Sequence, residues 1–343
     1  MRDLIVSGSI ARACPQVAEG IRRIEALFEG IKSFEDVEAA FLKGAGLSRN
    51  TYAAYLTSVR SFYHFTGGLN PLQVTAAHME SWYDFMLAGG AERNTARLRI
   101  ASLKSFFLGV ERVVGIFRSP FRDMPARLVK KLSRTKKPRT RGALTRSEVK
   151  GILEMLRADD SPEGWETLAI FTFLLTSGLR AAELCSLRWS DLNFNDETGW
   201  SAHFVQKGGD SAEQEIHHLA VKLSREAFRA RFRRDPRLDD ALFSTRPRFH
   251  GDVVRPLGYR SLRERIIGIE RAGRKAGVLA RDLAIRPHTM RRTFATLLVK
   301  GGMDLKSVQT LTRHASIEVL CRHYVDSAAR SAPTFDGILG VVA

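Results

Sequence analysis

Apolar side chains recur at helical spacing through the first third of the chain, and glycines and capping residues separate the segments. Residues 1–43 carry a pattern typical of one or two amphipathic helices. Further on, the pattern predicts a helix after Ser48, a second that Thr75 caps and a third that opens at Asn94. The third is expected to bury Leu98, Ile100, Leu103, Phe106 and Phe107. We therefore predict a small helical domain over residues 44–126.

The second half of the chain mixes buried helices with short strands. Thr145 and Glu148 have the spacing of a capping box, and residues 165–176 are almost wholly apolar, as in a buried helix. Short runs separated by turn residues predict a three-stranded antiparallel sheet. Its strands are expected at 192–194, 200–205 and 213–219. Basic helical segments follow at 220–234 and 259–277.

Three short helices are predicted between residues 287 and 324. Gly301 ends the first, Asp304 caps the second and Ser316 caps the third. The fold class expected from these patterns is mainly α-helical with a small three-stranded antiparallel sheet.

The charge of the chain points to a polyanionic partner. Lys and Arg number 54 against 37 Asp and Glu, which gives a net charge of +17 and a pI near 10.3. Nucleic acid is the first candidate and an anionic membrane the second. The longest apolar run, 168–175, is far shorter than the roughly 20 residues of a spanning helix, and the N-terminus does not resemble a secretory signal. We expect a cytoplasmic protein.

Its cysteines are few and widely spaced. Cys14, Cys185 and Cys321 form neither a disulfide framework nor a Cys-x-x-Cys metal site, and a reducing compartment suits them.

A strongly basic stretch separates the two halves. Residues 127–141 contain no acid, and Pro138 and Gly142 interrupt any helix, so we place a connector at 127–142. A basic run is often a disordered tail, but this one lies between folded segments and suits a connector along a DNA backbone. Its cations are Arg127, Lys130, Lys131, Arg134, Lys136, Lys137, Arg139 and Arg141.

Several scattered residues have the chemistry to act on a phosphate. Arg180 lies two residues after Gly178, at the head of a helix, and Glu183 is spaced to orient its guanidinium. His288 and Arg291 share one helix face. The others are Lys207 at a hairpin tip, His314 in a loop and Tyr324 near the end of a helix. Taken singly, each is explained as well by a solvated lysine, a structural histidine or a packed tyrosine.

Their joint order, together with the string TSGLRAAELCSLRWSDL at 176–192, resembles the tyrosine recombinase, or phage integrase, family. The basic bundle resembles that family's core-binding, SAM-like domain. The resemblance implies a two-domain, C-shaped clamp on double-stranded DNA: a helical N-terminal bundle and an α+β catalytic domain at 143–326, with a terminal extension at 1–43 and a tail at 327–343. It also implies a nucleoid-associated protein that is a tetramer on two DNA sites and a monomer or dimer off DNA.

The resemblance implies a role for each residue. Arg180 and Arg291 would bind the non-bridging oxygens, with Glu183 in support and His314 as a further donor. His288 would accept the phenol proton or hold the phosphate. Tyr324 would attack to leave a 3′-phosphotyrosine, and Lys207 would protonate the 5′ oxygen. No cofactor or metal is implied. The residues expected to contact DNA are Arg49, Arg60, Arg93, Arg97, Lys104, Lys130, Lys131, Lys136, Lys137, Arg139 and Arg141.

Some positions depart from the family pattern. His314 and Tyr324 are ten residues apart, one more than is usual, which leaves open whether Tyr324 acts in cis or in trans. Arg313 stands where glycine is common, and Arg292 replaces a frequent histidine. The apolar tail would dock on a neighbour or fold back. Two other functions stay open: a type IB topoisomerase-like strand transferase and a catalytically silent DNA-binding protein. The target site, the direction of recombination and any accessory proteins are not predicted.

Overall fold

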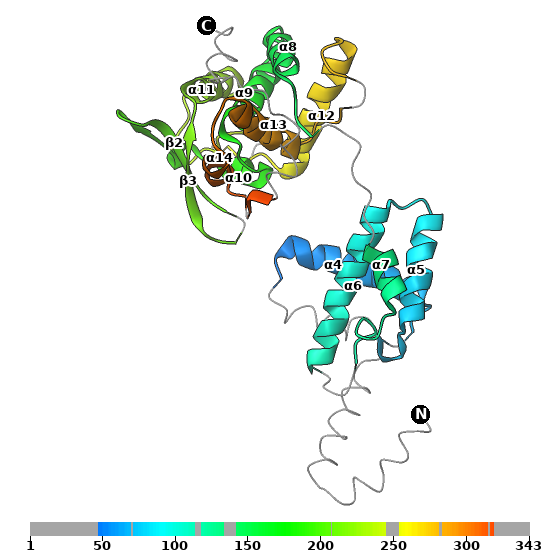
Figure 1. Cartoon of the computed structure of the whole chain (residues 1–343). Helices are drawn as coiled ribbons and strands as arrows, with labels where there is room; N and C mark the ends of the chain where they lie inside the picture. Colours follow the sequence, from blue (N-terminus) through cyan, green and yellow to red (C-terminus); the bar gives the residue numbers. More distant parts are fainter. Residues whose placement is uncertain are drawn as a thin grey trace, which may run out of the picture. The chain divides into compact units, whose positions relative to one another are not determined.

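The chain divides into two compact units, Met1–Pro138 and Arg139–Ala343 (Figure 1). The computed structural model describes residues 47–69, 71–113, 118–133, 142–206, 208–244, 254–280, 283–314 and 316–318. The helices expected within 1–43 and the tail at 327–343 lie outside these residues. None of the helices in the described ranges is both long and apolar enough to cross a membrane.

The N-terminal unit is the predicted helical bundle. Its elements are α4 (Arg49–Phe65), a 3-10 turn η3 (Pro71–Gln73), α5 (Ala76–Ala88), α6 (Arg93–Val113) and α7 (Ala126–Ser133). The predicted cap at Thr75 is present as a capping box with His78, and Ser48 caps the first of these helices by accepting the Thr51 amide. The core is aromatic, with the ring of Phe62 centred 5.2 Å from Trp82 and 6.5 Å from Phe107.

The prediction that Leu98 is buried was wrong. Its side chain is 59% exposed, whereas Ala96, Ile100 and Leu103 are buried. Positions 96, 100 and 103 share one helix face, and at about 100° per residue position 98 points away from it. The prediction used the hydrophobic character of Leu98 and not its position on the helix, and so assigned it to the buried face.

Helix α7 occupies the first half of the stretch predicted as a connector. Leu128 and Leu132, four residues apart, are buried in the bundle core. The Lys131 ammonium lies 2.9 Å from Glu80 Oε1 and 2.7 Å from Asp84 Oδ2, both on α5. The basic residues in the first half of the predicted connector therefore lie on an amphipathic helix of the N-terminal unit. The division between the two units comes later, after Pro138.

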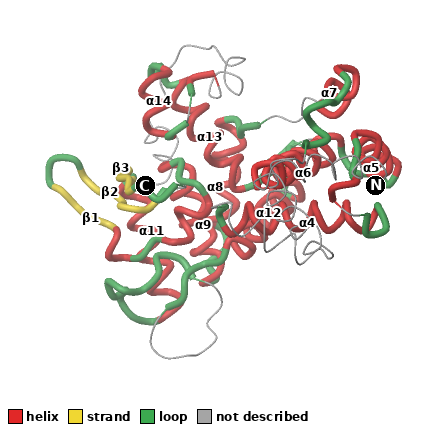
Figure 2. The backbone as a smooth tube through the Cα atoms, turned by 90° about the horizontal axis from the view of Figure 1, so that it is seen from below, coloured by secondary structure: helices red, strands yellow, loops and turns green. Residues whose placement is uncertain are grey.

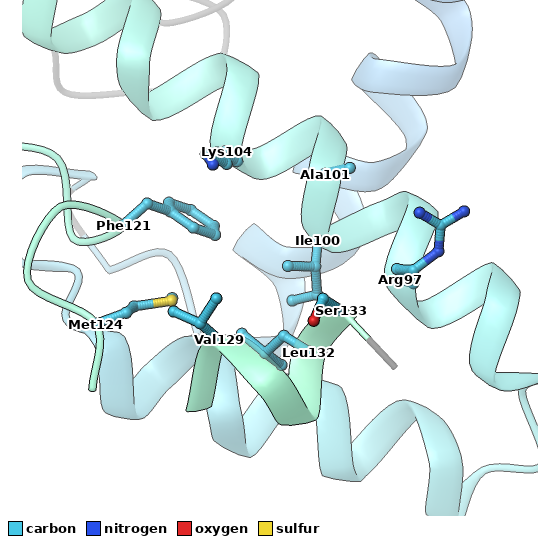
Figure 3. A pocket seen from close by; sticks show the side chains of 9 residues that line it. All are labelled: Arg97, Ile100, Ala101, Lys104, Phe121, Met124, Val129, Leu132 and Ser133. Atoms are coloured by element: carbon cyan, nitrogen blue, oxygen red, sulfur yellow. The ribbon is translucent and has the colours of Figure 1, made fainter. Parts of the chain in front are cut away.

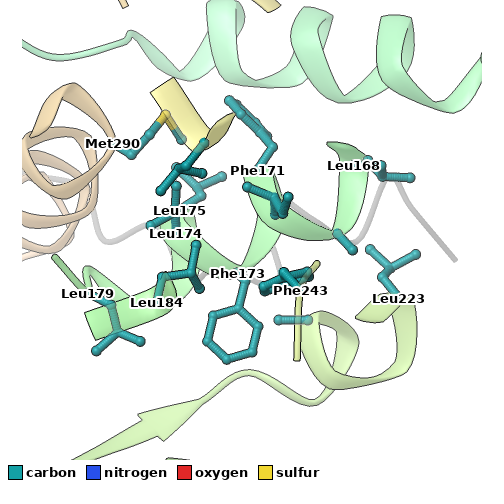
Figure 4. Packing of buried hydrophobic residues seen from close by; sticks show 14 of the residues in the cluster. Leu168, Phe171, Phe173, Leu174, Leu175, Leu179, Leu184, Leu223, Phe243 and Met290 are labelled. Atoms are coloured by element: carbon teal, nitrogen blue, oxygen red, sulfur yellow. The ribbon is translucent and has the colours of Figure 1, made fainter. Parts of the chain in front are cut away.

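The C-terminal unit is built around α9 (Pro162–Ser177), the apolar helix predicted at 165–176. Helices α8 (Arg146–Arg157), α11 (His218–Phe232) and α13 (Pro287–Lys300) pack on it. Phe171 and Leu175 of α9 lie among side chains from these neighbours, including Leu223 of α11 and Met290 of α13 (Figure 4). Helix α12 (Tyr259–Lys275) packs against α8 and α13.

The predicted antiparallel sheet is present at one edge of this unit (Figure 2). Its strands β1 (Leu192–Asn195), β2 (Gly199–Val205) and β3 (Ser211–Ile216) pair in sequence order. Ala202 and Phe204 of β2 turn inward and are buried. The third strand ends earlier than the expected residue 219, because the ring of His217 accepts the Leu219 amide and caps α11.

Short elements complete the unit. They are α10 (Ala181–Ser186), the 3-10 turn η4 (Trp189–Asp191) and α14 (Leu305–Thr312). Asp304 caps α14 as predicted, by accepting the Ser307 amide at 2.9 Å. Val308 of α14 packs on Ala295 of α13, so the loop after α14 is anchored to the same helix that carries His288 and Arg291.

Candidate active site

The turn from α9 to α10 brings together three of the predicted residues, Arg180, Glu183 and Arg291. Gly178 ends α9 with φ +61°, in the left-handed region. A Cβ atom there would lie 2.3 Å from Cδ1 of Phe294 on α13. Glycine is therefore required both by the backbone conformation and by the close approach of α13. This contact brings the helix of Arg291 to the turn that precedes Arg180.

Arg291 is buried beneath this turn, with 2% of its surface exposed. Its Nη1 donates to the carbonyl oxygen of Gly178 at 2.8 Å. A buried guanidinium needs such partners, because an unpaired charge inside a protein is costly. The bond fixes one terminal nitrogen and orients the planar group toward the segment that leads to Arg180.

Arg180 stands at the N-terminus of α10 and is held by Glu183. Its Nη1 donates to Glu183 Oε1 at 2.8 Å, and its backbone amide donates to Oε2 at 2.7 Å. The Glu183 side chain is 3% exposed and that of Arg180 is 35% exposed. The sequence-based prediction that Glu183 orients a guanidinium is consistent with this geometry. Arg180 also keeps a solvent-facing edge.

Burial acts to raise the pKa of Glu183. Hydrogen bonds from Arg180 and the positive charges of Arg313 and Arg180 outweigh that effect and hold the pKa below its ordinary value. Glu183 is therefore ionised at neutral pH and keeps both arginines oriented.

Arg313 also contacts Arg180 and Glu183, a position that the sequence did not predict. Its carbonyl oxygen accepts Arg180 Nη2 at 3.0 Å, and its own Nη2 donates to Glu183 Oε2 at 2.9 Å. The sequence marked Arg313 only as a departure from a common glycine. Its position next to His314 was the one signal that could have singled it out.

His314 follows Arg313 and is oriented by α14. Its carbonyl oxygen accepts Gln309 Nε2 at 3.0 Å, and its Nδ1 lies 2.5 Å from Thr312 Oγ1. The Thr312 hydroxyl donates its single proton to the Val308 carbonyl at 2.6 Å. We therefore assign the proton of this contact to Nδ1. The other nitrogen, Nε2, is then an acceptor in the neutral ring and a donor in the charged one.

His288 lies in the first turn of α13 and is exposed to solvent. It is three residues before Arg291, so the two share one side of the helix. The start of α13 is held in place by Glu270, which accepts the Ile285 amide at 2.7 Å and Arg286 Nη1 at 2.6 Å.

Lys207 and Tyr324 lie outside the described residues. The hairpin around position 207 is defined by its flanks: Gln206 N donates to the Asp210 carbonyl at 2.8 Å, and Gly208 and Gly209 have φ of +128° and +100°. The turn thus depends on glycines, which adopt these angles without steric cost. In the described part of the chain, no group of three or more His, Cys, Asp or Glu side chains could hold a metal ion.

The cations predicted to contact DNA differ in their surroundings. Arg49, Arg60, Arg93, Lys104 and Lys130 are exposed, and Arg97 is half-buried. Hydrogen bonds to Asp84 and Glu80 raise the pKa of Lys131, so its charge is already matched by two carboxylates. The remaining predicted contacts are outside the described residues. They are Lys136, Lys137, Arg139 and Arg141.

An apolar groove of about 200 Å³ runs between α6 and α7 beside two of these cations (Figure 3). Ile100, Phe121 and Leu132 line its floor, and Arg97 and Lys104 stand along its rim.

Comparison with known proteins identifies the family. The sequence model of the phage integrase family matches residues 143–330, and the model of the family's N-terminal SAM-like domain matches residues 39–112. The chain therefore belongs to the phage integrase family, the tyrosine recombinases. The resemblance drawn from the motifs at 176–192 and 287–324 is confirmed at the level of the family.

Curated relatives are tyrosine recombinases that match over most of their length. The chain is 25% identical to the tyrosine recombinase XerD of Rickettsia bellii (strain RML369-C) over 280 residues, which cover 79% of this chain and 86% of the relative. It is 28% identical to the tyrosine recombinase XerA of Pyrococcus furiosus over 284 residues, covering 81% and 84%.

Solved structures share the fold. The Tn1549 transposon integrase, in complex with circular intermediate DNA, superposes with a TM-score of 0.64 at 20% identity, covering 90% of this chain and 97% of that one. A lambda integrase dimer bound to a COC′ core site gives 0.62 at 17% identity, covering 88% and 99%. The predicted fold class, mainly helical with a small antiparallel sheet, is confirmed.

Proposed function

We propose that this enzyme is a site-specific recombinase that cuts and rejoins double-stranded DNA through a covalent 3′-phosphotyrosine intermediate, as a tetramer on two DNA sites. One observation carries the proposal. Two arginines are anchored on either side of one glycine turn, Arg291 by the Gly178 carbonyl and Arg180 by the buried Glu183. Such fixed guanidiniums suit a phosphodiester, whose non-bridging oxygens gain charge as a nucleophile attacks.

The donors of Arg180 are only partly used inside the protein. A guanidinium carries five N–H protons, and the side-chain bonds to Glu183 and the Arg313 carbonyl use two of them. The exposed edge of the group can therefore donate to a phosphate while the inner edge stays fixed. Preorganised donors of this kind lower the barrier because they need not reorient during the reaction.

The remaining steps require a nucleophile, a base and an acid. Tyr324 attacks the phosphorus and forms the phosphotyrosine bond, while the 5′ oxygen of the next nucleotide leaves and takes a proton from Lys207. His288 accepts the phenol proton or holds the phosphate, and His314, with its ring charged, donates from Nε2 to a non-bridging oxygen. The new ester preserves the energy of the bond that is broken, so religation needs neither a nucleotide cofactor nor a metal.

DNA as the partner is supported by charge and by likeness. The chain carries a net charge of +17, and exposed cations lie along α4 and α6. The Tn1549 and lambda integrases, which share the fold, are bound to DNA in their structures. We propose that the N-terminal helical unit, which includes α7, and the basic residues that follow it up to residue 142 hold one duplex while residues 143–326 cleave it, in a cytoplasmic protein associated with the nucleoid. The extension at 1–43 has no assigned role, and the tail at 327–343 is a docking segment for a neighbouring subunit.

A nicked suicide duplex tests the proposal. The DNA comes from the sequence that flanks the gene, and the product is a protein–DNA adduct that survives detergent. Wild-type protein is expected to form the adduct, and Tyr324→Phe to form none, because the phenol oxygen is the nucleophile. Tyr259→Phe is the matched control, since Tyr259 is exposed on α12 and is expected to leave the yield unchanged.

The outcomes separate the rival functions. A type IB topoisomerase-like enzyme would also form the adduct but would rejoin strands of the same duplex, whereas a recombinase joins strands from two. A catalytically silent DNA-binding protein would retain the duplex without any adduct. An adduct that persists in Tyr324→Phe would overturn the proposed nucleophile.

A further inference from the structure

Arg313 joins three separate parts of the C-terminal unit through its backbone and its side chain. We infer that it is a positioning residue for DNA cleavage, which fixes the His314 loop and the β2–β3 hairpin relative to Arg180. The inference rests on the proposed function, because cleavage is the step that the positioning serves.

The first link is a closed set of contacts with Arg180. Arg180 Nη1 donates to Glu183 Oε1 at 2.8 Å, and Arg313 Nη2 donates to Glu183 Oε2 at 2.9 Å. Arg180 Nη2 in turn donates to the carbonyl oxygen of Arg313 at 3.0 Å. Each arginine therefore restrains the other, and the residue directly before His314 cannot move without disturbing the guanidinium of Arg180.

The second link runs to the sheet. Arg313 Nη1 donates to Gln214 Oε1 at 2.5 Å, and its guanidinium carbon lies 4.7 Å from the ring centre of Phe204. Gln214 is on β3 and Phe204 on β2, and both side chains are buried. The two strands end at the turn around position 207. Arg313 thus contacts both strands of the hairpin, on the side near the turn that contains position 207.

The backbone of Arg313 shows that these contacts determine its position. Its φ of +51° and ψ of +45° lie in the left-handed region, which a side chain with a Cβ atom adopts at a steric cost. Glycine would meet the same geometry without that cost. An arginine persists there because Glu183, Gln214 and Phe204 hold its side chain.

The side chain of Arg313 is enclosed rather than presented to a ligand. It is 12% exposed, against 35% for Arg180. We therefore place Arg180 at the phosphate and assign to Arg313 an indirect action. Loss of the Arg313 guanidinium would leave Glu183 to Arg180 alone and would remove the side-chain links from the His314 loop to Glu183 and to the hairpin.

Arg313→Gly is the informative substitution, because it keeps the backbone conformation and removes the side chain. Arg233→Gly is the matched control: Arg233 also has a positive φ, +56°, and ends α11 on the exposed surface. Arg313→Lys restores the charge but not the planar fork that reaches both Glu183 and Gln214. Arg233→Gly reports the effect of relieving a left-handed backbone position alone. Arg313→Gly and Arg313→Lys distinguish the loss of the side chain from the loss of its planar geometry at constant charge.

The first measurement is single-turnover adduct formation on the nicked duplex at increasing DNA concentration. Arg313→Gly is expected to slow the rate at saturating DNA at least tenfold, with the half-saturating concentration changed less than threefold. Arg313→Lys is expected to recover part of the rate, and Arg233→Gly to match wild type. Equal rates for Arg313→Gly and Arg233→Gly would overturn the inference.

The second measurement does not need activity. Amide hydrogen exchange in the full chain is expected to accelerate at least fivefold in Arg313→Gly both at 309–318 and at 203–214, two segments joined through this side chain. If exchange rises but cleavage is unchanged, Arg313 is a structural link only and the positioning role is wrong. If the wild-type protein forms no adduct, the proposed function fails, and unchanged exchange would refute the link itself.

Discussion

The guanidinium of Arg291 donates to the carbonyl oxygen of Gly178 at 2.8 Å, two residues before Arg180. Residues separated by more than a hundred positions in the chain thus share one turn of backbone. The arrangement makes the geometry of the site depend on the packing of α9 against α13. Substitutions at this contact are expected to affect stability and cleavage together.

Gly178→Ala tests that dependence. The new methyl group would lie 2.3 Å from Phe294 Cδ1 in a backbone with φ +61°, so we expect a loss of about 3 kcal/mol in the free energy of unfolding and loss of adduct formation. Gly277→Ala is the control, since Gly277 has φ +71° but open space around it. It is expected to cost about 1 kcal/mol. Denaturant unfolding measures both, and equal losses would show that the Phe294 contact is unimportant.

Glu183→Gln is expected to lower stability in a pH-dependent way. The folded-state pKa of Glu183 is depressed, so its contribution is fully present above the unfolded value and is lost as the pH falls through the folded one. We expect a deficit of about 2 kcal/mol at neutral pH, from the weakened hydrogen bonds to the charged group, that shrinks in acid. Denaturant unfolding from pH 7 down to the acid limit of folding measures it, with the exposed Glu197→Gln as control. A deficit independent of pH would contradict the assignment.

Thr312 is expected to control the ring of His314. Thr312→Val keeps the shape of the side chain but removes the oxygen 2.5 Å from Nδ1, and we expect adduct formation to slow about tenfold, as for other residues that orient a functional histidine. Thr312→Ser retains the hydroxyl and should remain within about threefold of wild type on the same ground. The measurement is the single-turnover rate of adduct formation. Equal rates for the two variants would show that the Thr312 hydroxyl does not orient His314 for the reaction.

Mixing two inactive variants tests whether Tyr324 acts in cis or in trans. Under the proposed function, Arg180→Ala lacks a phosphate ligand and Tyr324→Phe lacks the nucleophile, so each alone should form no adduct. If the phenol is delivered to a neighbouring subunit, the mixture regains adduct carried by the Arg180→Ala chain. If the two variants are made as chains of different length, gel separation shows which of them is linked to the labelled DNA. No recovery in a mixture that still assembles on DNA would assign cis delivery.

The predicted phosphate contacts are distinguished by salt dependence. Removal of one phosphate contact reduces the steepness of the plot of log binding constant for DNA against log salt concentration by about 0.9. We expect this for Lys104→Gln, since Lys104 is exposed. Lys131→Gln is expected to leave the slope unchanged, because Glu80 and Asp84 already neutralise its ammonium. Fluorescence anisotropy at several salt concentrations measures both, and equal slopes for the two variants would contradict the distinction.

Much of the fold followed from local pattern. The caps at Thr75, Thr145 and Asp304 and the three strands were predictable because side-chain spacing and turn chemistry act over a few residues. Leu98 was misplaced because hydrophobicity does not say which helix face meets the core. The helix at 126–133 was not predicted, because the stretch was interpreted from its basic residues alone. The two leucines that it buries, Leu128 and Leu132, were not taken as a helical pattern.

Some residues of the candidate site could likewise be predicted from the sequence, and one could not. Arg180, Glu183, His288, Arg291 and His314 were singled out by spacing and by resemblance. Arg313 was not assigned a part, because its contacts with Glu183 and Gln214 join positions about 100 or more apart and no local pattern encodes them. Only the folded chain shows that the residue next to His314 restrains Arg180.

If the proposed function holds, the burial of Arg291 under the Gly178 turn would matter for how subunits cooperate. Arg180 and Arg291, the two arginines proposed to bind the scissile phosphate, belong to one polypeptide and are held by its own groups, so they would be in place before a second protomer arrives. A neighbour could then contribute or withdraw its phenol without dismantling that pair. Recognition and commitment to strand breakage would be separable events, each open to its own control.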